Sequence, residues 1–180
     1  MGSLQSVIGA SVAPVLNQAH WYAVQTRPRH EKKILAELGE KGIDSYLPLL
    51  NQVHRWSDRR QVVQVPLFPG YVFVHAHLDS EVRVAVLRSW GALAFVGPQR
   101  EPLPIPDSEI EDIRTLLLTK LPLTPYPFLK VGQHVRVRGG ALDGLEGILV
   151  TNGARRLVIS VTTIQRSLSI TIEGYDVEPA

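Results

Sequence analysis

The hydrophobic pattern of this chain changes at a short stretch that contains three prolines, and this change limits the folds that the chain can adopt. Before residue 118, strand-like segments alternate with segments of helical period. Pro122, Pro125 and Pro127 then lie in a stretch without helical period, which is typical of a linker. Beyond it, the apolar segments are short, strand-like and punctuated by glycines, as in a small all-β barrel. The pattern therefore predicts two domains joined by a linker over residues 118–127.

The first domain, residues 20–117, is expected to have an α+β fold in which helices flank an antiparallel sheet. Aromatic and β-branched residues predict strands over 20–26, 44–53, 61–65, 70–75 and 93–96. Helices are expected to begin near Pro28, Ser80 and Asp107. The second of these is predicted to extend to Trp90, with Val82, Val86 and Trp90 on one face. Residues 1–19 are expected to form a disordered leader.

The second domain, residues 128–180, is predicted to contain only strands. The expected strands cover 133–138, 147–151, 155–161 and 167–173. The last two are dense in β-branched residues, which lose side-chain freedom in a helix. A stable helical alternative for this domain is therefore disfavoured.

Composition excludes several classes of function. The chain has 180 residues, no cysteine and a formal net charge of +2. Without cysteine there is no disulfide scaffold, cysteine nucleophile, iron–sulfur cluster or cysteine-based zinc finger. Because the net charge is small, contact with nucleic acid has to come from local clusters of basic residues. Such clusters occur at the first helix and in the loop after the second strand, and consist of Arg27, Arg29, Lys32 and Lys33, and of Arg55, Arg59 and Arg60.

No catalytic motif is present in the sequence. It contains no Gly-x-Ser-x-Gly elbow, no Walker loop and no Gly-x-Gly-x-x-Gly sequence. His75 and His77 lie on the same side of an expected strand, but no third metal ligand is evident nearby. We expect no catalysis, no cofactor and no metal. The longest apolar stretch near the start is too short to span a bilayer, so we expect no membrane contact.

Two sets of segments carry a family resemblance. The first set consists of residues 21–26 (WYAVQT), 66–74 (PLFPGYVFV) and 95–97 (FVG). The second is residues 131–147 (VGQHVRVRGGALDGLEG), which have the pattern of a strand, a glycine turn and a second strand. The first set resembles the N-terminal (NGN) domain of the NusG family of transcription elongation factors. The second resembles a KOW motif, which opens a five-stranded SH3-like barrel. The resemblance covers about residues 20–178 and implies a cytoplasmic, monomeric elongation or antitermination factor that binds RNA polymerase.

The aromatic residues around a Pro-Gly corner are the first candidates for a binding site. From the pattern alone, Phe68, Tyr71 and Phe73 favour a place in the core. The resemblance implies instead that the face containing Gln25, Phe68, Tyr71 and Phe73 binds the clamp helices of the largest polymerase subunit. Bridging the clamp to the opposite lobe would keep the enzyme closed around DNA and suppress pausing or termination, without catalysis.

The basic clusters are the second set of candidates. The resemblance places the first domain over the non-template DNA strand, which Arg27, Lys32, Lys33, Arg55, Trp56, Arg59 and Arg60 would contact. Trp56 either stacks on an unpaired base or folds back on its own hairpin.

The second domain differs from the pattern of housekeeping members, which carry Pro-Phe where this chain has Ala141-Leu142. This chain also has Ile164-Gln165-Arg166 where those members carry Phe-Gly-Arg. In these two departures and in the 66–71 segment, the chain resembles the specialised RfaH and UpxY-type paralogues. Leu142, Ile164 and Arg166 are the expected contacts of the KOW domain with a second partner, a small-subunit ribosomal protein or the Rho terminator. The alternative function is a KOW-containing RNA-binding protein associated with ribosomes.

Overall fold

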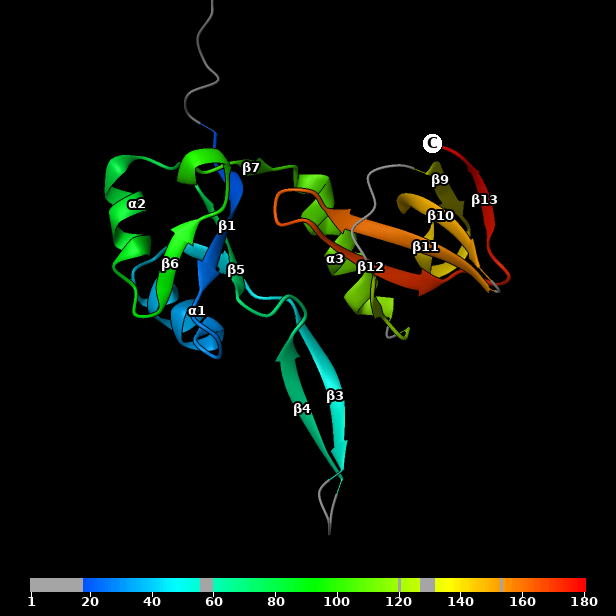
Figure 1. Cartoon of the computed structure of the whole chain (residues 1–180), viewed down its shortest axis with the longest axis horizontal. Coiled ribbons are helices and arrows are strands. Elements are labelled where there is room, and N and C mark those ends of the chain that lie inside the picture. Colours follow the sequence, from blue (N-terminus) through cyan, green and yellow to red (C-terminus); the bar gives the residue numbers. More distant parts are fainter. Residues whose placement is uncertain (1–17, 56–59, 120, 127–131, 153) are drawn as a thin grey trace, which may run out of the picture.

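In the part of the chain that the structure describes, the strands form three sheets (Figure 1). The structure is a computed structural model that describes residues 18–55, 60–119, 121–126, 132–152 and 154–180. The expected leader therefore lies outside the described residues, apart from residues 18 and 19.

The first sheet is antiparallel, and β1 lies at its centre. Its order is β2-β5-β1-β6, and β7 also pairs with β1. The strands are β1 (His20–Thr26), β2 (Asp44–Tyr46), β5 (Tyr71–Ala76), β6 (Ala92–Phe95) and β7 (Pro104–Ile105). Side chains of β1 alternate between the two faces, so Tyr22 and Val24 belong to one hydrophobic cluster and Trp21 and Ala23 to another. Both faces of this sheet are covered.

Helices α1 (Glu31–Glu40) and α2 (Ser80–Leu87) cover the Tyr22 face. The Asp79 side chain caps α2 by accepting a hydrogen bond from the Val82 backbone N–H at 2.8 Å. The prediction that this helix extends to Trp90 was wrong, because α2 ends at Leu87 and the chain then turns back toward β6. Trp90 therefore lies beyond the end of the helix and does not join Val86 in the core. It is 60% exposed.

A two-stranded hairpin projects away from this sheet (Figure 1). It consists of β3 (Leu49–Arg55) and β4 (Arg60–Pro66). The single strand expected over 44–53 is thus divided between β2 and β3, which belong to different sheets. Within the hairpin, Val53 pairs with Val62 and both side chains are 62% exposed.

The third sheet has the order β13-β9-β10-β11-β12-β8, and we call it the C-terminal sheet. Its strands are β8 (Thr124–Tyr126), β9 (Gln133–Arg138), β10 (Glu146–Asn152), β11 (Ala154–Val161), β12 (Arg166–Thr171) and β13 (Asp176–Pro179). β8 comes from the stretch expected to be a linker, and it pairs at the sheet edge with β12. A proline is tolerated there because an edge strand has backbone N–H groups without a ladder partner.

Helix α3 (Asp107–Thr119) lies between the first sheet and the C-terminal sheet (Figure 1). Its Ile110, Ile113 and Leu116 are buried in one continuous cluster that includes Phe73 of the first sheet and Leu157 of the C-terminal sheet. The two parts of the chain thus share a hydrophobic core in this arrangement, which we call the closed arrangement.

Candidate functional site at the junction of the two sheets

Gln25 and Tyr71 lie side by side on the face of the first sheet that looks toward the C-terminal sheet. They are register partners on β1 and β5. Gln25 is exposed and Tyr71 is half-buried. A hollow of about 500 Å³ opens beside both, and its wall includes Leu93, Val96 and Arg100. The pair therefore forms the accessible part of the predicted polymerase-binding face.

The Pro-Gly corner before Tyr71 is held by a buried carboxylate. Glu31 is 4% exposed, and its Oε1 accepts a hydrogen bond from the Gly70 backbone N–H at 2.8 Å. The Gly70 carbonyl in turn accepts from the Thr26 N–H at 2.8 Å. Gly70 has φ +85°, a conformation that side chains with a Cβ rarely adopt. These contacts fix the start of β5, and with it the position of Tyr71.

Phe68 and Phe73 occupy the core beneath this face. Phe68 is 4% exposed and Phe73 is fully buried, and their rings meet edge to face with centroids 6.1 Å apart. The burial of these two residues agrees with the interpretation from the pattern alone, in which aromatic residues favour the core. In the closed arrangement neither ring is a surface anchor, and both support Tyr71 from below.

The three residues predicted to contact a second partner lie at the same junction. Leu142 is fully buried in the short 3₁₀ helix η3 (Gly140–Leu142), which contacts α3. Ile164 is 5% exposed, and the turn around it borders a cavity of about 430 Å³ together with Tyr71. The Arg166 guanidinium carbon lies 5.9 Å from the Tyr71 ring centroid. The structure thus brings Arg166 and Tyr71, two separately predicted site residues, into contact.

Helix α3 contacts both parts of the chain through polar side chains. The Arg114 guanidinium lies over the rings of Trp21 and Tyr46 in the first sheet, 5.3 Å and 5.0 Å from their centroids. On the other side, Glu109 Oε2 accepts a hydrogen bond from the Thr162 backbone N–H at 3.1 Å. The helical pattern over these residues gave no sign of their role, because it does not show that two different sheets lie against the helix.

Carboxyl groups gather where α3 faces the C-terminal sheet. Glu109, Asp112, His134 and Glu146 border a cavity of about 550 Å³. Burial, then the charges of Glu146, Glu109 and Glu111, raise the pKa of Asp112 to about 6. Burial also raises the pKa of Glu109, although its hydrogen bond to Thr162 opposes this. In the closed arrangement, Asp112 therefore reaches its titration midpoint near pH 6 instead of near its ordinary value of 3.8.

The predicted nucleic-acid contacts that the structure describes, on and before α1, divide between two places. Lys32 Nζ donates to the Gln64 carbonyl at 2.8 Å and joins α1 to the hairpin. Arg27 and Lys33 lie instead around the Trp90 ring. Trp56 and Arg59 lie outside the described residues, as do the side chains of Arg55 and Arg60. Trp90 is not among the predicted site residues, although Gly91 directly after it indicates a turn at that point.

Within the described ranges, no three metal-ligating side chains gather as a metal site would require. His75 instead stacks on Trp21, with ring centroids 4.8 Å apart. No helix in the described part of the chain has the length and apolar character to cross a membrane.

Comparison with known proteins shows which family this chain resembles. The family model described as "Transcription termination factor nusG" matches residues 19–114. The chain is similar to the transcription termination/antitermination protein NusG of Borreliella burgdorferi, with 24% identity over 88% of this chain and 97% of that protein. It is also similar to the Thermus thermophilus NusG, with 26% identity over 89% and 98%.

Among solved structures, the fold resembles that of Thermotoga maritima NusG, reported in a study of its domain interaction. The TM-score is 0.53 and the identity is 23%, over 90% of this chain and 97% of that one. Because the family model spans more than half of the chain and the relatives match along nearly their whole length, the chain belongs to the NusG family of transcription termination and antitermination factors.

Proposed function

We propose that this protein binds the clamp helices of the largest RNA polymerase subunit through the face around Gln25 and Tyr71. The observation that carries the proposal is the pairing of these two residues beside a hollow lined by both apolar side chains and Arg100, on a strand start fixed by Glu31. An aromatic ring beside a concave apolar surface is a common anchor in protein interfaces. Phe68 and Phe73 contribute by supporting this face rather than by touching the partner.

The proposed action is mechanical. With the clamp helices bound, the first domain bridges the polymerase clamp to the opposite lobe and keeps the enzyme closed around DNA, which suppresses pausing and termination. The non-template strand runs past Arg27, Lys33 and the hairpin arginines, which contact its phosphates. No step in this mechanism makes or breaks a covalent bond, and it takes place where polymerase and DNA lie, in the cytoplasm.

The C-terminal sheet is proposed to be an SH3-like KOW barrel that contacts a second partner, a small-subunit ribosomal protein or Rho. Leu142, Ile164 and Arg166 are its candidate contacts. Leu142 and Ile164 are buried in the closed arrangement, and Arg166 lies against Tyr71. The closed arrangement thus buries Leu142 and Ile164 and partly covers Tyr71, while Gln25 stays exposed. We propose that the two parts must separate before the second partner binds and before the whole Tyr71 face is open to polymerase. The departures at Leu142 and Ile164 support a specialised paralogue that acts on particular operons.

A binding assay with the isolated clamp helices tests the first proposal. Tyr71→Ala should abolish most of the affinity, because the ring is the half-buried anchor of the face. Leu118→Ala is the matched control, since Leu118 is an apolar side chain on α3 that is 81% exposed. Equal affinity of the Tyr71 variant and the parent chain would refute the assigned face.

A pull-down with core polymerase and, separately, with ribosomal subunits distinguishes the two classes of function. Capture of polymerase alone supports the elongation factor. Capture of ribosomal subunits without polymerase would replace it with the ribosome-associated RNA-binding protein.

A further inference from the structure

Trp90 is a large aromatic residue that is exposed to solvent in the folded protein. Its side chain is 60% exposed, whereas that of Trp21 is 5% exposed. It lies in the turn between α2 and β6, on the side of the first sheet covered by α1 and α2, away from the Gln25 face. The hydrophobic effect does not explain an exposed indole, so its role has to be sought in what holds and surrounds it.

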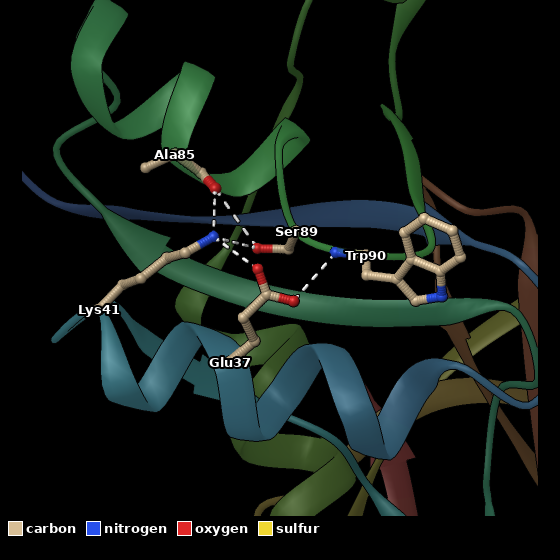
Figure 2. A network of polar contacts seen from close by, with 5 residues as sticks. All are labelled: Glu37, Lys41, Ala85, Ser89 and Trp90. Atoms are coloured by element: carbon tan, nitrogen blue, oxygen red, sulfur yellow. Dashed lines mark hydrogen bonds and ion pairs between the residues drawn. The ribbon is translucent and has the colours of Figure 1, made fainter.

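The backbone of Trp90 is fixed by a polar network that ties α1 to the end of α2 (Figure 2). The Trp90 N–H donates to Glu37 Oε2 at 2.9 Å, and Glu37 Oε1 accepts from Lys41 Nζ at 2.8 Å. Lys41 Nζ also donates to the Ala85 carbonyl at 3.0 Å and to Ser89 Oγ at 2.9 Å. In Figure 2 the indole points away from this network, so the polar groups fix the backbone of Trp90 without using its ring.

The residue after Trp90 is equally constrained. Gly91 has φ +104°, and a Cβ added there would meet the Cβ of His30 at 2.7 Å, so only glycine fits. The Gly91 carbonyl accepts a hydrogen bond from the Arg27 N–H at 2.8 Å. The turn is therefore rigid on both sides of the indole, and it brings Trp90 next to Arg27.

Two cations flank the ring. The Arg27 guanidinium carbon lies 5.6 Å from the ring centroid of Trp90, and Lys33 Nζ lies 5.9 Å from it. Both side chains are exposed, and within the described part of the chain neither forms an ion pair with a carboxylate. Their charges are thus available to an external anion.

We propose that Trp90 is a stacking platform for one unpaired nucleobase of a single-stranded nucleic acid, with Arg27 and Lys33 contacting the phosphates on either side. A fixed, exposed aromatic face between two unneutralised cations matches the alternation of flat base and anionic phosphate in such a strand. An acidic peptide would use the cations but leave the ring unused. The inference rests on the nucleic-acid contact in the proposed function and assigns it to a residue outside the predicted set.

Binding of dT12 and U12 oligonucleotides to the full chain tests the platform. Anisotropy of a labelled oligonucleotide gives the affinity. The chain has three tryptophans, so only the fluorescence quenching that is lost in Trp90→Phe is assigned to Trp90. Trp90→Ala should weaken binding about five- to 150-fold, the value of one stacking contact. Trp90→Phe keeps a flat ring and should bind within about threefold of the parent. Tighter binding of dT12 assigns the site to DNA, and tighter binding of U12 assigns it to RNA.

Charge variants and a peptide probe complete the test. Arg27→Ala and Lys33→Ala should each lower the salt dependence of binding by a slope of about 0.7. Unchanged oligonucleotide affinity of Trp90→Ala would overturn the proposal, and so would a poly-glutamate peptide that binds with the same dependence on Trp90. Clamp-helix binding by the same Trp90→Ala protein is measured in parallel and should be unchanged. If the parent chain does not bind the clamp helices, the proposed function is refuted. If it binds them but Trp90→Ala leaves oligonucleotide binding unchanged, only this platform is refuted.

Discussion

Arg166 of the C-terminal sheet lies over the ring of Tyr71 in the first sheet, with its guanidinium carbon 5.9 Å from the ring centroid. One residue is proposed to contact a second partner and the other to contact polymerase. If both proposals hold, each partner competes with the chain's own other half. The strength of this internal contact would then set how readily either partner binds.

Replacing Arg166 by alanine should favour separation of the two halves. A cation–π contact at an exposed site stabilises by about 0.5–1 kcal/mol. We expect the affinity for isolated clamp helices to rise about two- to fivefold, measured by calorimetry. Arg156→Ala is the control, because Arg156 is exposed on β11. An Arg166 variant that binds no more tightly than this control would show that the contact does not limit binding.

The closed arrangement should become more favourable as pH falls from 7.5 to 5. The pKa of Asp112 is about 6 in the closed arrangement, against an ordinary value of 3.8. A carboxyl group with a raised pKa takes up a proton on closing, so closing is favoured at low pH and weakened as the pH rises through 6. Glu109, Glu111, Glu146 and His134 lie around it. We expect the ratio of closed to open chains to change by about tenfold, the value of one pKa unit after solvent screening.

NMR signals of the Tyr71 ring report this equilibrium. Asp112→Asn removes the titrating group and should keep the chain closed at pH 7.5, with most of the pH dependence lost. If the variant keeps the full pH dependence of the parent, another group controls closing.

Phe68→Ala should destabilise the fold instead of acting on binding alone. The ring is 4% exposed and packs edge to face on Phe73. Removing a buried phenylalanine costs about 3–5 kcal/mol, measured as the free energy of unfolding in urea. The exposed Leu118→Ala should stay within about 0.5 kcal/mol of the parent. A loss below about 1 kcal/mol for Phe68→Ala would contradict its place in the core.

Reversing Arg55, Arg59 and Arg60 to glutamate should weaken engagement of transcription complexes that carry an exposed non-template strand. Each lost phosphate contact should lower the salt slope by about 0.7. Binding to isolated clamp helices, the control, should change little. A triple variant with the parent's salt slope and DNA footprint would exclude the loop from the DNA interface.

The sequence predicted most strands of both parts and the start of α3, because their periodicity and turn residues are local signals. It missed the end of α2. Val82, Val86 and Trp90 fit one helical face, but the chain turns after Leu87, and the glycine at 91 was the available sign. It also missed β8, since Pro125 suggested a linker and only its pairing with β12 makes it a strand.

The site was less accessible to sequence reasoning for a physical reason. Alternation along β5 places Tyr71 and Phe73 on one face but does not show how much of that face the rest of the chain covers. Leu142 and Arg166 lie on segments far from Tyr71 in sequence, so their shared junction depends on how the two halves pack. The role proposed for Trp90 needed the Glu37 contact, which joins residues 53 positions apart.

Helix α3 makes separation of the two halves costly in free energy. Its Ile110, Ile113 and Leu116 are buried together with Leu142 and Leu157 of the other half, so separating the halves brings apolar surface into water. If the two halves separate as proposed, a partner has to cover this apolar surface over an extended area to make opening favourable. A small or weakly apolar partner does not offset the cost. The buried face of α3 would then select partners by the apolar area that they bring to the junction.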